Sequence, residues 1–221
     1  MEPVSSNQPN PPSINDNSLV SKHFDQKRIT DIFNVEKCVQ AINKGRDSLE
    51  QQGLVLKTIT DADFDKIDPL VQEYEKEFAP LTKSTPKADG RYELDTPWTD
   101  PNCGIYLMKQ DKVIGFCTIE ICDDNLLDVG EFFIIKSERR KGYGKEFAHA
   151  IFAAFPSRWQ VREIEAAKSA QDFWLITIRE YTNNDFENAM ASDDFWGNIH
   201  KQTFNSFSSS PQILLETTQK I

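Results

Sequence analysis

Apolar and polar positions divide the chain into a series of expected elements. From Ile29 to Ile42 the apolar residues recur at roughly helical spacing, and Gly53 is placed to end this region. The helix predicted there either packs on the main domain or offers its apolar face to a partner. The stretch 54–60, LVLKTIT, is rich in β-branched residues and predicts the first strand of the core.

A second helix and a long loop are expected next. Asp61 can cap a helix whose apolar positions continue to Tyr74, and Pro69 is expected to interrupt that helix. Residues 80–102 contain four prolines and few apolar positions, which predicts a loop. Long loops in compact domains are often functional, so this one is a candidate wall for an acceptor site.

The middle of the chain has the pattern of three strands. The stretches 104–109 and 113–121 are separated by QDK and predict a short hairpin, and 126–135 predicts a third strand. Gly130 lies inside this third strand. A glycine there indicates a β-bulge or a close approach of another group to the backbone.

Helical and extended patterns alternate after the third strand. Apolar positions from Phe147 to Phe155 form one helical stripe, and His149 is expected on the opposite, solvated face. The stretch 158–164 alternates like a strand, 167–178 predicts a helix, and 181–207 gives only weak strand signals.

This order of elements predicts a mixed α+β fold, in which a central mixed sheet carries helices on both faces. Prolines, serines and asparagines at the start of the chain predict a disordered tail. The expected boundaries are a tail at 1–22, an N-terminal helical extension at 23–53, a main domain at 54–207 and a C-terminal tail at 208–221.

Composition narrows the classes of function. The 221 residues carry a formal net charge of −10, which argues against binding to nucleic acid because phosphates would be repelled. The four cysteines form no CxxC pair and no metal-ligand spacing with histidine, so we expect reduced thiols, no metal and a cytoplasmic protein. No segment resembles a signal peptide or a membrane span, so no membrane partner is expected.

A basic turn precedes the helix of the middle region. Five basic residues fall between positions 136 and 145, around Gly142 and Gly144. A helix N-terminus presents unpaired amides, glycines allow close approach, and added cations can pair with negative oxygens. The pattern is neither a Walker A loop nor a Rossmann fingerprint, since Phe147 stands where a third glycine would be needed. It suits a pyrophosphate, although a basic turn on a solvated surface is the alternative.

The stretch FFIIKSERRKGYGKEFAHAIFAAFPSRWQVREIE, with AQDFW after it, resembles the GNAT superfamily of N-acetyltransferases. In particular it is similar to small predicted acetyltransferases with an RRRGxG, FPGRWEVRQ and AFW pattern. The similarity covers Gly104 to Thr182, and the order of elements extends it to Leu54. The resemblance implies acetyl-CoA as the bound coenzyme and a V-shaped splay between two central parallel strands.

The resemblance also implies which residues bind acetyl-CoA. The turn would hold the pyrophosphate through its amides, the strand before it would pair with the pantetheine arm, and the next strand would splay away to leave a cleft. The cofactor-binding residues implied in this way are Phe133, Ile134, Ile135, Arg139, Arg140, Lys141, Gly142, Tyr143, Gly144, Lys145 and Trp174.

Amine acetylation needs a group that removes a proton from the acceptor, because a lysine-type ammonium has a pKa of about 10.4. Asp128 and Glu131 are the candidates for this base, with Glu120 beside them; the alternative is that these acids are outward residues of half-exposed strands.

Many relatives have a tyrosine that protonates the departing thiolate. In this chain Trp174 stands at that position, and Ala167 replaces a frequent asparagine. Tyr181 or Tyr143 could substitute as the acid, and Tyr181 is the candidate we retain.

The function implied is acetyl-CoA-dependent N-acetyltransfer to a primary amine of a small cationic molecule or a lysine side chain. The missing tyrosine and asparagine leave open an alternative, a non-catalytic CoA-binding or protein-interaction domain. The expected partner is a small-molecule amine or a protein lysine, and the expected assembly is a monomer or a homodimer.

Overall fold

The structure of the protein is a computed structural model that describes residues 28–122 and 126–207. The predicted tails at 1–22 and 208–221 lie outside these residues. The elements in chain order are α1 (Ile29–Ile32), α2 (Val35–Gly45), α3 (Asp47–Gln51), β1 (Leu54–Thr58), η1 (Asp61–Asp63), α4 (Phe64–Thr82), β2 (Cys103–Lys109), β3 (Lys112–Ile121), β4 (Leu126–Ile134), η3 (Lys136–Glu138), α5 (Tyr143–Ala154), β5 (Arg158–Ile164), α6 (Lys168–Thr182), β6 (Glu187–Asp193) and β7 (Gly197–Asn205).

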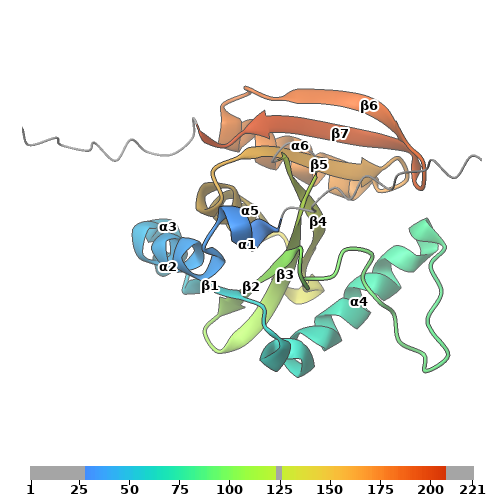
Figure 1. Ribbon diagram of the computed structural model, residues 1–221, viewed down its shortest axis with the longest axis horizontal. Coiled ribbons are helices and arrows are strands. Elements are labelled where there is room, and N and C mark those ends of the chain that lie inside the picture. Colours follow the sequence, from blue (N-terminus) through green and yellow to red (C-terminus); the bar gives the residue numbers. More distant parts are fainter. Residues whose placement is uncertain (1–27, 123–125, 208–221) are drawn as a thin grey trace, which may run out of the picture.

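The strands form one seven-stranded sheet in the order β1-β2-β3-β4-β5-β7-β6 (Figure 1). Neighbours in the sheet are antiparallel except β4 and β5, which are parallel and joined through α5. A parallel pair needs such a crossover, because a tight turn cannot return the chain to the same edge. The single parallel pair therefore lies at the centre of a mixed sheet.

Helices cover both faces of this sheet, as the pattern of the sequence predicts. On one face α4 packs Tyr74 edge-on against Phe116 and Phe133 of the central strands. On the other face Phe152 of α5 packs against Trp159 of β5, and α6 contacts α5. The fold-class prediction is confirmed, and the core consists of these two apolar layers.

The N-terminal helices belong to the same packed unit. Phe33 meets Phe155, at the end of α5, with ring centroids 5.3 Å apart, and Val39 and Leu49 are buried. The side chain of Asn43 both accepts from the amide of Leu56 and donates to its carbonyl, at 2.9 and 2.8 Å. These bonds satisfy the backbone N–H and C=O of Leu56 in the edge strand β1, which would otherwise be open to pairing.

The expected break at Pro69 does not occur, and that prediction is wrong. A short 3₁₀ turn leads directly into one helix, α4, which contains both Pro69 and Pro80. Pro69 is near the start of the helix, so the carbonyl that it leaves without a partner belongs to the first turn. The buried side chains of Ile67 and Val71, on either side of Pro69, keep the helix continuous despite the missing backbone hydrogen bond.

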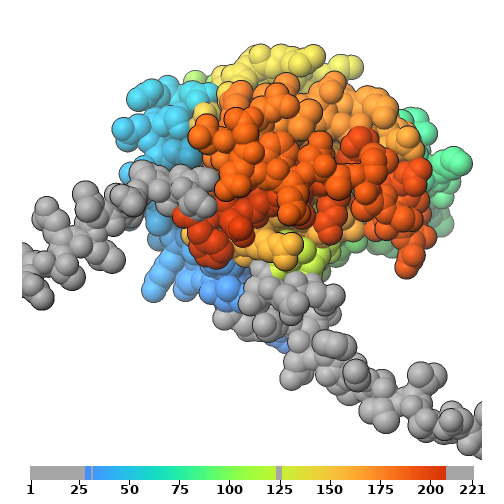
Figure 2. All heavy atoms as spheres, turned by 90° about the horizontal axis from the view of Figure 1, so that it is seen from above, coloured from blue at the N-terminus to red at the C-terminus, as the bar shows by residue number. Residues whose placement is uncertain are grey.

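Two details differ at the C-terminal side. The region that gave weak strand signals contains two strands, of which β6 has mainly exposed residues and no apolar alternation to reveal it. Figure 2 shows the orange and red atoms of these last elements forming most of the face seen from above.

His149 is half-buried rather than solvated: its Nε2 lies 2.9 Å from the carbonyl of Thr177 on α6.

None of the helices within residues 28–122 and 126–207 has the length and apolar character that crossing a bilayer requires.

Candidate active site

A cleft opens where β4 and β5 diverge. The two strands pair only over Leu126–Asp128 and Arg158–Gln160, and beyond these residues the ladder between them ends. The space between them is a cleft of about 170 Å³. It is lined by the later parts of β4 and β5, α4, the start of α6, Trp196 of the β6–β7 turn and Ile199 of β7. The predicted 80–102 loop, which begins only after α4 ends at Thr82, also lines it.

A bulge at Gly130 turns β4 away from its regular course. Thr118 pairs with Glu131 and Ile119 pairs with Val129, so Gly130 is the extra residue between them. The hydroxyl of Thr118 accepts the amide of Glu131 at 2.8 Å. A Cβ at Gly130 would clash with the side chain of Thr96, so the 80–102 loop lies directly against the bulge. Glycine is required here by this close approach.

The basic turn follows β4 and leads into α5. Arg140 and Gly142 both have positive φ, 62° and 86°, and α5 begins at Tyr143. Within the described chain the amides from Arg140 to Lys145 have no acceptor on the protein. This is the arrangement of a helix N-terminus open to an anion. A Cβ on Gly144 would lie 3.3 Å from Phe173, so α6 packs against both the turn and the cleft.

Residues 67–175 match the family model described as the acetyltransferase (GNAT) family. The chain contains a GNAT acetyltransferase domain. No curated protein matched the chain.

Two solved structures show the same fold. One is an acetyltransferase from Thermus thermophilus, with 13% identity, 69% of this chain and 96% of that chain covered, and a TM-score of 0.52. The other is RimL, a ribosomal alpha-N-protein acetyltransferase in complex with coenzyme A, with 10% identity, 71% and 96% covered, and a TM-score of 0.50. At these identities the likeness concerns the fold alone.

The side chains of the basic turn of the GNAT domain are largely engaged by the protein. Arg139 forms a bidentate ion pair with Glu77 of α4, at 2.6 and 2.7 Å, and its Nε donates to the carbonyl of Ile134. Lys141 pairs with Glu138, and Lys145 pairs with Glu180. The guanidinium of Arg139 thus ties α4 to the turn, so its contacts do not support the expected steering of phosphates.

The other predicted coenzyme residues divide between the core and the cleft. Phe133, Ile134 and Ile135 are buried, and none of them lines the cleft. Tyr143 accepts a hydrogen bond from Lys109 at 2.6 Å, beside the start of α5. Trp174 lines the cleft and packs on Phe132, with ring centroids 4.9 Å apart.

Asp128 lies at the closed end of the strand pair. Its Oδ2 accepts from Arg162 Nε at 2.5 Å and from Gln160 at 2.7 Å, and Arg162 also bonds Glu120 at 2.9 Å. Burial raises the pKa of Asp128 to about 6, while Arg162 opposes the shift. Asp128 does not line the cleft, so the structure does not bring this candidate base to the place where an acceptor could lie.

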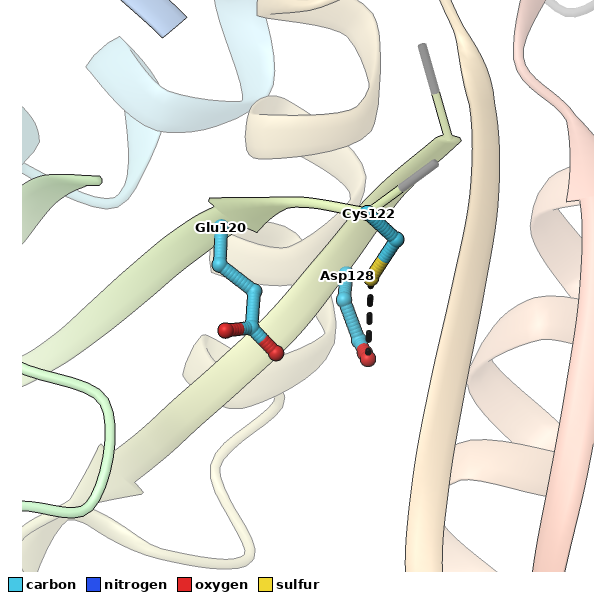
Figure 3. Close-up of side chains that lie close together, drawn as sticks. All are labelled: Glu120, Cys122 and Asp128. Atoms are coloured by element: carbon cyan, nitrogen blue, oxygen red, sulfur yellow. Dashed lines mark hydrogen bonds between the residues drawn. The ribbon is translucent and has the colours of Figure 1, made fainter. Parts of the chain in front are cut away.

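Glu120, Cys122 and Asp128 have potential ligand atoms within 4.8 Å of one another (Figure 3). Figure 3 shows the carboxylates of Glu120 and Asp128 extending to the same side of the sheet. The guanidinium of Arg162 bonds both of them, so this cluster already contains its balancing cation. The geometry is that of an ion-pair network rather than an open metal site.

Glu131 is the predicted acid that the structure brings into the cleft. It lies next to the bulge, accepts from the hydroxyl of Tyr74, and accepts from the amide of Thr96 at 3.0 Å. Burial raises the pKa of Glu131 to about 7, against the lowering effect of these two bonds. Both protonation states are therefore accessible near neutrality.

Two further buried acids line the cleft. Burial, with Asp95 as the second cause, raises the pKa of Glu75 to about 7. Burial raises the pKa of Glu163 to about 8. The sequence carried a signal for both, because Glu75 follows Val71 by one helical turn and Glu163 continues the inward alternation of Trp159 and Val161. Neither residue is among the candidate acids selected from the sequence, which are Asp128, Glu131 and Glu120.

Tyr181 is placed away from the cleft. It lies near the end of α6, where its ring packs against Phe152 and His149 at centroid distances of 5.3 and 5.1 Å. It does not line the cleft. The structure therefore does not bring Tyr181 to the position expected of the acid.

Proposed function

We propose that the protein is an acetyl-CoA-dependent N-acetyltransferase that acts on a primary amine of a small cationic molecule or of a lysine side chain. The observation that carries this proposal is the acid-lined cleft between β4 and β5 in a GNAT domain. Within the described residues, none of Glu75, Asp95 and Glu131 takes part in an ion pair.

The residues around the turn fit the coenzyme. Amides from Arg140 to Lys145 would bind the diphosphate, and Arg140 would add a charge at the rim. α6 contacts the turn through Phe173 and lines the cleft through Trp174, which would lie beside the pantetheine arm. When bound there, acetyl-CoA supplies an acetyl thioester, which is activated toward attack by an amine.

Glu131 is the base in this proposal. An acceptor ammonium must lose a proton before it can attack, and a carboxylate whose pKa is near 7 can take that proton at neutral pH. Tyr74 and Thr96 hold the carboxylate in place beside the bulge. The pair Glu131 and Tyr74 lies on the face of the sheet covered by α4, so we expect the acceptor to enter from that side.

Glu75 and Asp95 give the cleft its preference for a cation. Glu75 is 8% exposed, lines the cleft and, within the described chain, makes no side-chain hydrogen bond or ion pair. Buried carboxylates without a countercharge are costly, so a positively charged acceptor would stabilise the ionised forms of both Glu75 and Glu131. An acceptor that carries its own carboxylate would be repelled by the same groups.

The test combines binding and turnover. Calorimetry with CoA should show binding to the wild type and none to Gly142→Trp, because a bulky side chain at a positive-φ position blocks the turn. Gly90→Trp is the matched control, since Gly90 also has positive φ but lies in the 80–102 loop. Mass spectrometry of reactions with polyamines, aminoglycosides, lysine peptides and free amino acids should show acetylation of the cationic acceptors.

The outcomes separate the proposed function from its alternative. CoA binding without acetylation of any amine would identify a non-catalytic CoA-binding domain. Equal CoA binding by wild type and Gly142→Trp would show that the turn is not the diphosphate site. A preference for acceptors that carry a carboxylate would contradict the assigned role of Glu75 and Asp95.

A further inference from the structure

Acetyl transfer leaves a thiolate that gains a proton, and the residue at the position expected for the donor is Trp174, whose indole is not a useful acid. We propose that Glu163 is the general acid that protonates the departing sulfur, an assignment that rests on the function proposed above. It would place the two proton-transfer groups, Glu131 and Glu163, on opposite faces of the same cleft.

The strand register carries this geometry. Glu163 alternates with Val161 and Trp159 along β5, and Trp159 packs on Phe152 of α5. Glu163 therefore points to the face of the sheet covered by α5 and α6. Glu131 points to the opposite face, where it bonds Tyr74 of α4. Both residues line the one cleft, because the strands have separated before either is reached.

Glu163 lines the same cleft as Trp174, the position that the sequence leaves without an acid. The α6 side of this cleft is lined by Ala167, Ala170 and Trp174. None of these three side chains can supply a proton. Arg162, the neighbouring residue in the chain, also lines the cleft, but its guanidinium is held by Asp128 and Glu120.

The surroundings of Glu163 keep its proton in place until it is needed. Its side chain is 4% exposed, and burial raises its pKa to about 8. Asp128 of β4 adds to this rise, and His200 of β7 is the cross-strand neighbour. The side-chain amide of Gln202 is oriented with its nitrogen toward Glu163, and it donates to Glu163 Oε1 at 2.7 Å. This hydrogen bond fixes the carboxyl group without supplying a countercharge.

The proton balance is closed by these two acids. Glu131 first passes the ammonium proton of the acceptor to solvent. The neutral amine nitrogen then bonds to the carbonyl carbon and gives up a second proton to Glu131. The carbon–sulfur bond breaks, its electron pair stays on sulfur, and the proton of Glu163 forms the S–H bond. Each turnover leaves Glu131 protonated and Glu163 ionised, and exchange with solvent restores both. A thiol with a pKa of about 8.5 and an acid with a pKa of about 8 are matched for this transfer.

The first measurement does not depend on activity. In protein labelled with ¹³C at the glutamate carboxyls, one NMR resonance should titrate near pH 8 and be missing from Glu163→Gln. A Glu163 resonance that titrates near pH 4.5 would overturn the assignment, because the residue would then carry no proton to donate at neutral pH.

The second measurement is the pH profile of kcat. Glu163→Gln should lower kcat by ~10–100-fold, leave KM for both substrates within about threefold, and remove the decline above pH 8. Glu165→Gln is the matched control, since Glu165 is an exposed acid just after the same strand. If Glu163→Gln leaves kcat and its pH profile unchanged, the assignment of Glu163 is overturned, while the proposed function stands. The same conclusion follows if Tyr181→Phe, rather than Glu163→Gln, removes the decline in kcat above pH 8. Failure of the wild type to acetylate any amine would remove the proposed function itself.

Discussion

The two ends of the β4–β5 pair differ in whether their buried acids have a positively charged partner. At the closed end Asp128 is fully buried and accepts from Arg162 and Gln160. At the open end Glu131 and Glu163 are almost as buried, yet their bonds come from neutral groups. The same two strands therefore carry an ion-pair network at one end and uncompensated acids at the other.

The difference indicates which acids stabilise the fold and which are available for chemistry. A buried acid held by an arginine resists both protonation and displacement, because either change removes an ion-pair partner of that arginine. An acid held by a hydroxyl or an amide can exchange its proton near neutrality without breaking an ion pair. Sequence position alone did not separate the two, since Asp128 and Glu131 are three residues apart on one strand.

The sharpest way to break this comparison is to remove one acid from each end. Glu131→Gln should lower kcat/KM by ~10²–10⁴-fold with little change in the free energy of unfolding, because the base is lost and its neutral partners remain. Asp128→Asn should instead lower the free energy of unfolding by ~1–3 kcal/mol, because Arg162 loses a buried partner. Steady-state kinetics and urea denaturation measure the two effects. A larger loss of kcat/KM in Asp128→Asn than in Glu131→Gln would reverse the assignment of the base.

Removing the cation of the closed end should cost the fold more. Arg162→Leu leaves Asp128 buried without its arginine and Glu120 without its ion pair, so we expect a loss of ~3–5 kcal/mol in the free energy of unfolding. Arg158→Leu, at the exposed start of the same strand, should change it by less than about 0.5 kcal/mol. Urea denaturation compares the two variants, and equal losses would mean that the network does not stabilise the protein.

Glu131 and Glu163, the acids of the open end, should make the free energy of unfolding depend on pH. The pKa values of Glu131 and Glu163 are raised to about 7 and about 8, so the folded state binds more protons than the unfolded state from about pH 4.5 upward. Their contribution to stability is fully present below pH 4.5 and is lost as the pH rises to about 8. Glu163→Gln should remove part of this slope and be ~1–3 kcal/mol more stable than wild type at pH 9. Thermal unfolding of wild type and Glu163→Gln at pH 5 and pH 9 tests this expectation. If the stability of the two proteins changes equally between these pH values, Glu163 is not a buried, protonated acid.

The smallest expected effect concerns the bulge that separates the two ends. Gly130→Ala should lower the free energy of unfolding by ~1–2 kcal/mol, because its Cβ would displace Thr96 and the loop behind it. Thr96→Gly in the same chain should recover much of that loss by removing the clashing side chain. A double-mutant cycle in urea measures this coupling. Additive losses would mean that the loop does not rest on the bulge.

Local patterns in the sequence determined most of the fold. Helical stripes, alternating strands and the glycine-rich basic turn were all visible, because each depends on neighbours a few residues away. The bulge was also visible, since a glycine inside a strand has few other reasons to be there. The unbroken helix through Pro69 was not visible in the sequence, because packing against the sheet outweighs the local preference of proline. Strand β6 was not visible either, because pairing with β7 forms it.

Only the tertiary structure decided which acids can act. The fate of a carboxyl depends on the groups that meet it from other elements: Arg162 reaches Asp128 from a strand 34 residues later, and Tyr74 reaches Glu131 from a helix 57 residues earlier. Arg139 likewise meets Glu77 of α4 rather than remaining at the rim. Charges on neighbouring elements and burial set these roles, and both are created by folding rather than by the order of residues.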